Sequence, residues 1–152
     1  MSEAIDKNKI IQIGIRVNDI DKAAEEWKAF LGIEPIMGET EAQEYTHAEY
    51  YGEPTHAKLR QALFDIENIE IELISTQDDI PSGWAEGLGN PKAEGLHHLA
   101  FYTKDMDKAI EVMKNNGFEM TQKGDWRGDA PGSYAYFDGS DRLKTIIELL
   151  KF

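Results

Sequence analysis

Short runs of alternating apolar and polar residues dominate the chain. Between Ile10 and Val17 the odd-numbered positions are aliphatic, and Gln12, Gly14 and Arg16 occupy the opposite face of the predicted strand. A run at 69–73 alternates in the same way and places both of its glutamates opposite its aliphatic residues. This period of two predicts half-buried β-strands with one polar face.

The pattern occurs twice along the chain, which indicates an internal repeat. Strand-like runs at 10–17 and 96–103 are each followed by the motif D-x-D-K-A, which begins a predicted helix, and each half closes on a strand that contains I-E-L. The predicted strands before the closing ones lie at 59–64 and 133–137. We therefore predict one domain of the α+β class, built from two paired βαβββ modules that form a curled eight-stranded mixed sheet. Module one covers about 8–76, a linker about 77–94 and module two about 95–152.

Both predicted helices have start and stop signals. Asn18 or Asp19 can cap the first by accepting backbone N–H bonds, and the helix dipole favours Asp21 in its first turn. Gly32 ends the first helix and Gly117 the second. The linker is rich in glycine, proline and polar residues, and the polar, aromatic-dotted stretch 38–56 is predicted as a long loop or a ragged hairpin.

Composition narrows the functional classes. The chain has 152 residues with 41% hydrophobic and 30% charged positions, which is typical of a globular domain, and it has no cysteine for a disulfide or thiolate metal site. No apolar run approaches the ~20 residues of a membrane span, so we expect a cytoplasmic protein without a membrane partner. The formal charge of −13 argues against nucleic acid as a partner.

Four polar residues occupy repeat-related positions on these strands. Gln12 and His98 are equivalent in the first strands of the two modules, and Glu72 and Glu148 are equivalent in the closing strands. If the two curled sheets face each other, these side chains meet in the cleft between them. An imidazole, two carboxylates and an amide oxygen suit one divalent ion of zinc, nickel, cobalt, manganese or iron with open coordination positions.

The segment Gly95-Leu-His-His-Leu-Ala-Phe-Tyr-Thr-Lys-Asp-Met-Asp resembles methylmalonyl-CoA epimerases of the vicinal oxygen chelate superfamily, also described as the glyoxalase/bleomycin resistance/dioxygenase superfamily. The resemblance covers nearly the whole chain from Ile10 and places the metal ligand at His98, with His97 as a supporting or packing residue. It implies enolate chemistry stabilised by the metal, a small-molecule substrate and a homodimer.

Two enzymatic branches compete within that resemblance. Epimerases of this type usually carry His, Gln, His and Glu as ligands, whereas this chain offers Gln, Glu, His and Glu, which is similar to zinc-type glyoxalase I. Glu94 and Thr76 depart from the glyoxalase pattern, which has a glutathione-binding arginine and an asparagine there. The strand before Glu72 lacks the second catalytic acid of epimerases and reads Lys58-Leu-Arg60-Gln61.

The resemblance implies that Glu148 is the catalytic base and that Glu72 is a second base or only a ligand. Arg16, Lys58, Arg60 and Arg127 are predicted to bind an anionic substrate, either a thioester or a hemithioacetal. The leading prediction is a metal-dependent epimerase or isomerase most like methylmalonyl-CoA epimerase, and a lactoylglutathione lyase is the alternative. A third alternative is a non-catalytic small-molecule binding protein of the same fold, but such proteins typically lack the metal ligands that this chain retains. Ring-cleaving dioxygenases usually have two histidine ligands, whereas this site offers one.

Overall fold

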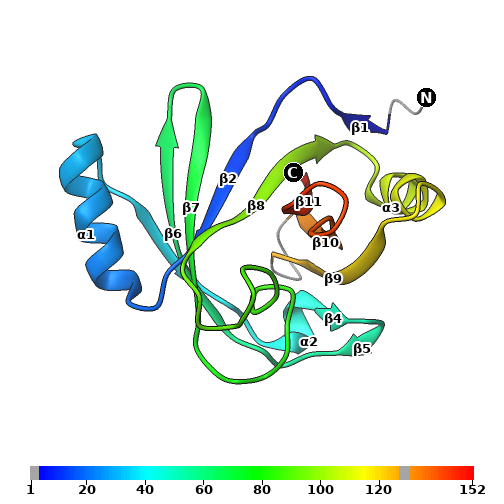
Figure 1. Ribbon diagram of the computed structural model, residues 1–152, viewed down its shortest axis with the longest axis horizontal. Helices are drawn as coiled ribbons and strands as arrows, with labels where there is room; N and C mark the ends of the chain where they lie inside the picture. The colour runs from blue at the N-terminus through cyan, green and yellow to red at the C-terminus, as the bar shows by residue number, and fades with distance from the viewer. Residues whose placement is uncertain (1–3, 127–130) are drawn as a thin grey trace.

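The computed structural model describes residues 4–126 and 131–152. Figure 1 shows a large, curled and unclosed sheet with helix α1 at one end and helix α3 at the other. Within the described residues the sheet has eleven strands, ordered β3-β6-β7-β2-β8-β11-β10-β9-β4-β5, with β1 added beside β8. The predicted α+β class with a curled mixed sheet is confirmed, although three short strands extend the eight that were expected.

The two halves repeat one order of elements. The first half contains β2 (Gln12–Arg16), α1 (Ile20–Leu31), β3 (Ile36–Glu39), β6 (Leu59–Ile66) and β7 (Ile69–Thr76). The second half contains β8 (Gly95–Thr103), α3 (Met106–Asn115), β9 (Glu119–Asp125), β10 (Ser133–Asp138) and β11 (Ile146–Lys151). In each half the first strand pairs in parallel with the last one, β2 with β7 and β8 with β11. The halves then join through antiparallel pairing of β2 with β8, so one chain supplies both sides of the sheet.

Aspartate caps begin both helices. Asp19 accepts a hydrogen bond from Lys22 N at 3.1 Å, and Asp105 accepts one from Lys108 N at the same distance. Gly32 ends α1 at φ 74°, in the left-handed region that glycine enters without steric cost. The repeated D-x-D-K-A motif is therefore a repeated helix start.

The stretch 38–56, predicted as a long loop or a ragged hairpin, contains a short antiparallel hairpin and a short helix. It contains α2 (Gln43–Thr46), β4 (Glu49–Tyr50) and β5 (Glu53–Pro54), and β4 pairs with β9 of the second half. The remaining strand, β1 (Ile5–Asp6), pairs with β8. An insertion in the first half thus extends the sheet edge of the second, as the lower part of Figure 1 shows.

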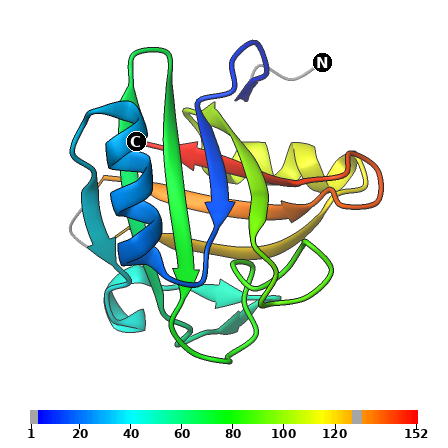
Figure 2. The ribbon, with the colours of Figure 1, turned by 60° about the vertical axis from the view of Figure 1, so that its left-hand side comes forward.

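Strand alternation sorts side chains between the two faces. On the outer face, one apolar cluster packs beneath α1 and a second beneath α3, each built from alternate residues of the strands. Figure 2 shows α1 lying across the strands of its own half. A third cluster, which includes Trp84, Tyr134 and Tyr136, lies on the inner face beside the predicted polar residues. The sheet therefore has an apolar exterior under its helices and a mixed polar and aromatic interior.

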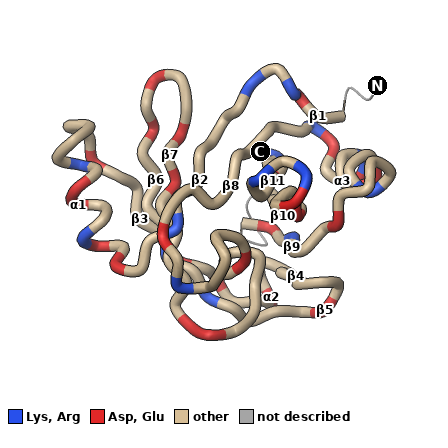
Figure 3. The backbone as a smooth tube through the Cα atoms, in the orientation of Figure 1, with Lys and Arg blue, Asp and Glu red and all other residues tan. Residues whose placement is uncertain are grey.

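Among the helices in the described part of the chain, none is long and apolar enough to cross a membrane. Acidic positions are spread over both halves in Figure 3.

Candidate metal centre

The four predicted ligands come from the central strands of the sheet. Gln12 lies on β2, Glu72 on β7, His98 on β8 and Glu148 on β11. Each residue is buried, with 8% exposure at most. In the parallel pairs, Gln12 lies opposite Glu70 and His98 lies opposite Ile146. Glu72 and Glu148 each follow two residues after those positions, on the same face of the strand. Consequently, all four residues point into the same interior space.

His98 Nε2 is the point on which the other three residues converge. It lies 2.9 Å from Gln12 Oε1, 3.0 Å from Glu148 Oε2 and 3.3 Å from Glu72 Oε1. One ring nitrogen carries at most one proton and cannot satisfy three oxygens at once. Glu148 Oε2 is buried yet takes part in no hydrogen bond of good geometry.

These distances match the edges of a metal coordination shell. Ligands at about 2.0–2.2 Å from a divalent ion lie roughly 2.9–3.5 Å from one another. The ligand atoms of Glu72, His98 and Glu148 all lie within 4.8 Å of one another. The residues present therefore fit a divalent cation of the nitrogen- and oxygen-binding type.

A glycine makes room for the histidine. Gly14 faces His98 across the β2–β8 pair, and a Cβ added at Gly14 would lie 2.0 Å from His98 Cε1. No real side chain tolerates that approach, so the imidazole lies directly on the backbone of β2. Gln12 similarly lies opposite Ala100, another small residue. Each of these two ligands thus has a small residue facing it on the neighbouring strand.

His97 fixes the orientation and tautomer of His98. The Nδ1 atoms of the two rings are 2.8 Å apart, and His97 Nε2 lies 3.1 Å from the carbonyl oxygen of Gly83. A carbonyl only accepts hydrogen bonds, so His97 Nε2–H donates to Gly83 and His97 Nδ1 accepts from His98 Nδ1–H. When His98 Nε2 is not protonated, its lone pair faces the carboxylates, which is the form that binds a metal.

Burial and charge set the protonation of the cluster. Burial alone lowers the pKa of His98, but the Glu148 and Glu72 carboxylates raise it to about 10. Burial raises the pKa of Glu72, and burial together with His98 and Arg16 lowers the pKa of His97 well below 6.5. In the absence of a metal, His98 thus holds a proton among acids, and a divalent ion would compete with that proton for the same site.

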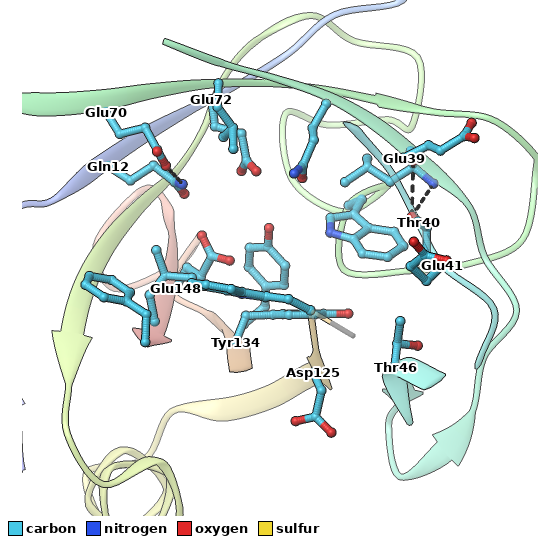
Figure 4. A pocket seen from close by; sticks show the side chains of 18 residues that line it. Gln12, Glu39, Thr40, Glu41, Thr46, Glu70, Glu72, Asp125, Tyr134 and Glu148 are labelled. Carbon is cyan, nitrogen blue, oxygen red and sulfur yellow. Dashed lines mark hydrogen bonds between the residues drawn. The ribbon is translucent and has the colours of Figure 1, made fainter. Parts of the chain in front are cut away.

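The cluster opens into a cavity of about 570 Å³. Figure 4 shows Gln12, Glu70, Glu72 and Glu148 at one side of the cavity and the segment from Glu39 to Glu41 at the other. Aromatic side chains also line it, namely Trp84, Trp126, Tyr134, Tyr136 and Phe152. Among the described lining residues there is no lysine or arginine.

Arg16 has a different role from the predicted one. It is 1% exposed, and all five of its guanidinium N–H groups donate to backbone carbonyls of the linker. The acceptors, at 2.6–3.0 Å, are the carbonyl oxygens of Trp84, Glu86, Gly87, Asn90 and Ala93. No donor remains for a substrate, so these contacts correct the prediction: Arg16 fastens the linker to β2.

Of the other predicted substrate-binding residues, Arg60 and Lys58 do not line the cavity either. Arg60 points to the helix side of β6 and forms a two-pronged ion pair with Asp21 of α1 at 2.9 and 3.0 Å. Lys58 is exposed and lies outside the cavity lining. The alternation of β6 explains this, because Leu59 and Gln61 face the cavity and their neighbours face away. Arg127 lies outside the described residues.

Glu70 is a site residue that the sequence analysis left without a role. Its Oε1 accepts a hydrogen bond from Gln12 Nε2 at 2.6 Å, which orients the amide oxygen of Gln12 toward His98. Burial raises the pKa of Glu70. The signal was available, since Glu70 shares a strand face with Glu72.

Comparison with known proteins identifies the fold independently. The family model described as "Glyoxalase/Bleomycin resistance protein/Dioxygenase superfamily" matches residues 11–137. A hypothetical protein from Bacillus halodurans superposes with a TM-score of 0.64 at 20% identity, covering 97% of this chain and 96% of that one. The search of curated proteins found no match.

Two of the similar solved structures are methylmalonyl-CoA epimerases. The enzyme from Mycobacterium tuberculosis has a TM-score of 0.64 and 20% identity, with 99% of this chain and 91% of that chain covered. A variant of the Streptomyces coelicolor enzyme, solved with 2-nitronate-propionyl-CoA, has a TM-score of 0.61 and 19% identity, with coverage of 94% and 96%. At these identities the likeness concerns the fold.

Proposed function

Because the chain belongs to the Glyoxalase/Bleomycin resistance protein/Dioxygenase superfamily, we propose that it is a divalent-metal-dependent isomerase or epimerase. It would move a proton on a carbon next to a carbonyl group. One observation carries the proposal: His98 Nε2 lies within 3.3 Å of Gln12, Glu72 and Glu148 at the inner end of a cavity large enough for a small molecule.

A divalent ion held by these four residues would polarise a substrate carbonyl and stabilise the negative charge that forms when the adjacent C–H loses its proton. The proton itself would be moved by side chains of this chain. Glu148 is the proposed base, because its carboxylate is buried and lines the cavity. Glu72 reaches the same space from the other half of the sheet, so it can hold or return the proton on another face.

Epimerisation of an acyl thioester is the leading substrate hypothesis. It is supported by the fold shared with methylmalonyl-CoA epimerases, one of which was solved with a CoA ligand. A lactoylglutathione lyase reaction is the second candidate. It is supported by the contact between Glu72 and His98, since this places a carboxylate where the epimerase pattern has another donor. The homodimer expected from the resemblance remains a prediction.

The proposal is tested by metal content and by proton exchange. Purified protein should hold about one divalent ion per chain by elemental analysis, as the cluster around His98 implies. Glu148→Gln should abolish exchange of substrate α-protons with D₂O while the protein still folds, and Glu111→Gln on the exposed surface of α3 is the matched control. Racemisation of methylmalonyl-CoA and turnover of the methylglyoxal–glutathione adduct then separate the two reactions. Absence of bound metal after reconstitution contradicts the proposal.

A further inference from the structure

Tyr134 lines the cavity but has no part in the proposed metal centre. It lies on β10, where Tyr136 pairs with Glu148 of β11 and Tyr134 pairs with Leu150. Tyr134 is therefore two residues further along the sheet than the proposed base, a displacement of about 7 Å. Figure 4 shows Tyr134 and Glu148 on one wall of the cavity. The side chain of Tyr134 would thus meet a part of a bound molecule other than its reacting carbon.

The ring of Tyr134 is held in place on several sides. Tyr134 is 9% exposed, and its ring centroid lies 6.2 Å from that of Trp84 and 5.6 Å from that of Tyr136. Gly124 faces it on β9, and a Cβ added at Gly124 would lie 2.9 Å from the Tyr134 hydroxyl oxygen. The absence of a side chain at Gly124 therefore lets the ring lie on the backbone of β9, as Gly14 does for His98 on β2.

Gln122 determines which hydrogen-bonding capacity Tyr134 has left. Gln122 is fully buried, and its Oε1 accepts a hydrogen bond from Gly83 N at 2.7 Å. Since a backbone N–H only donates, this contact fixes the orientation of the amide and turns Nε2 toward Tyr134. Gln122 Nε2 donates to the Tyr134 hydroxyl oxygen at 2.9 Å. That oxygen already accepts a hydrogen bond, so the phenol proton must find its acceptor in another group.

The described residues offer no acceptor for this proton. Gln122 is the one hydrogen-bond partner of the Tyr134 hydroxyl among them, and Asp125 on the adjacent strand is paired with His47 at 3.0 Å. Burial raises the pKa of Tyr134 more than the hydrogen bond from Gln122 lowers it, and the Glu148 carboxylate raises it further. The hydroxyl therefore keeps its proton at neutral pH. A buried O–H group without an acceptor is costly, and a ligand that carries an acceptor oxygen removes this cost.

We propose that Tyr134 is a specificity-determining residue of this site, whose O–H donates a hydrogen bond to a carbonyl or carboxylate oxygen of the substrate. This oxygen is a second one, distinct from the carbonyl oxygen next to the reacting carbon. The proposal rests on the proposed function, which makes the cavity a substrate site. In an acyl thioester the second oxygen has two possible sources, a carboxylate on the α-carbon or an amide carbonyl in the thiol arm. Either source satisfies the donor, and a substrate without the oxygen leaves it unpaired.

Two pairs of thioesters, each differing by the acceptor oxygen, test the proposal and separate the two sources. Methylmalonyl-CoA and isobutyryl-CoA differ in the α-carboxylate. S-propanoyl-N-acetylcysteamine and S-pentyl thiopropanoate differ in the amide of the arm. Calorimetric titration of the full chain, reconstituted with a divalent metal, compares these probes in the parent protein and in Tyr134→Phe. In one pair, Tyr134→Phe should weaken binding of the oxygen-bearing member about tenfold and leave its partner unchanged.

The matched control is Tyr45→Phe, which removes a hydroxyl from an exposed residue outside the cavity lining and should change no affinity. A merely structural role of Tyr134 would weaken both members of a pair equally. The proposal is overturned by that result, by unchanged affinities in Tyr134→Phe, or by a failure of all four thioesters to bind.

Exchange of substrate α-protons with D₂O remains the separate test of the proposed function. Exchange in the parent protein without a selective loss in Tyr134→Phe contradicts the role of Tyr134 alone. A selective loss of binding without any exchange in the parent protein contradicts the proposed reaction alone.

Discussion

The two halves of this sheet have the same architecture but contribute differently to the site. Gln12 of the first half corresponds to His98 of the second, Gly14 to Ala100, and Glu70 to Ile146, as their pairing with the neighbouring strands shows. The second half therefore supplies a nitrogen ligand whose partner on the neighbouring parallel strand, Ile146, is apolar. The first half supplies the amide of Gln12, the carboxylate of Glu70 that orients it, and the glycine at position 14 that leaves room for His98. A duplicated scaffold fixes where side chains meet, and the differences between the copies decide what they do there.

The asymmetry extends to the ends of the first strands. Arg16 binds five linker carbonyls, whereas its counterpart Tyr102 packs against Phe152 with ring centroids 5.0 Å apart. The first half thus holds the connection between the copies, and in the second half Tyr102 packs against Phe152, which lines the cavity. The following predictions, from the largest expected effect to the smallest, test whether equivalent positions really differ in this way.

Substituting the equivalent ligands should give unequal losses. His98→Ala should reduce metal affinity by more than about a thousandfold, because it removes the nitrogen on which the other ligands converge. Gln12→Ala should cost only about ten- to a hundredfold, since a neutral amide oxygen is the weakest donor of the set. Competition titration with a chromogenic chelator measures both, and equal losses would contradict the asymmetry.

Substitutions of the small residues Gly14 and Ala100 should also have unequal effects on metal affinity. Gly14→Ala forces a Cβ into the His98 ring, so we expect metal affinity to fall about a hundredfold and stability to drop by about 2–3 kcal/mol from overpacking. Ala100→Gly should cost about 1 kcal/mol of stability, from backbone freedom in a strand, and leave metal binding intact. Urea unfolding and the chelator titration distinguish the two variants.

Removing the linker anchor should affect stability and not substrate binding. Arg16→Met leaves five buried or half-buried carbonyls without their donor, and we expect a loss of about 3 kcal/mol in the free energy of unfolding. Lys58→Met, which alters an exposed cation, should change it by less than about 0.5 kcal/mol. A large rise in KM for Arg16→Met with unchanged stability would restore the original prediction for this residue.

The hydrogen bond between His97 and His98 can be tested without substituting a metal ligand. His97→Phe keeps the ring volume but removes both nitrogens, so His98 Nδ1–H loses its acceptor and metal affinity should fall about ten- to a hundredfold. Ile11 occupies the equivalent position in the first half, and Ile11→Val should have no comparable effect on metal affinity. The spectrum of the cobalt-loaded protein should shift in the His97 variant if His98 is reoriented. An unchanged spectrum with unchanged metal affinity would contradict the proposed role of His97 in orienting His98.

Metal affinity should rise with pH. Since the pKa of His98 is raised to about 10, binding must displace a proton across the neutral range, and the affinity should increase about tenfold per pH unit up to that value. The sign for metal-free stability is the reverse. The stabilisation from protonated His98 is complete below the unfolded pKa of about 6.5 and is lost as pH rises through about 10. Unfolding in EDTA at several pH values, with His98→Gln as the control that lacks this dependence, provides the measurement.

Local patterns predicted much of the fold. The period of two located the strands, the repeated aspartates located both helix caps, and the repeat paired Gln12 with His98 and Glu72 with Glu148. The stretch 38–56 was less predictable, because α2 and β4 owe their form to the neighbouring strand β9 and not to their own periodicity. The roles of Arg16 and Arg60 were missed for a related reason, since the sequence marks a basic residue but not the acceptors that the folded chain brings to it.

The sequence by itself determined the duplicated α+β architecture and the four polar residues of the central strands. These features depend on interactions between residues close in sequence and on the alternation of apolar and polar side chains, which can be read from the sequence. Only the tertiary structure decided that Gly14 makes room for His98, that His97 sets its tautomer, that Arg16 belongs to the linker, and that the cavity is acidic and aromatic. Each of these facts joins residues from distant parts of the chain, and the approach of such residues is set by how the two halves curl and pair.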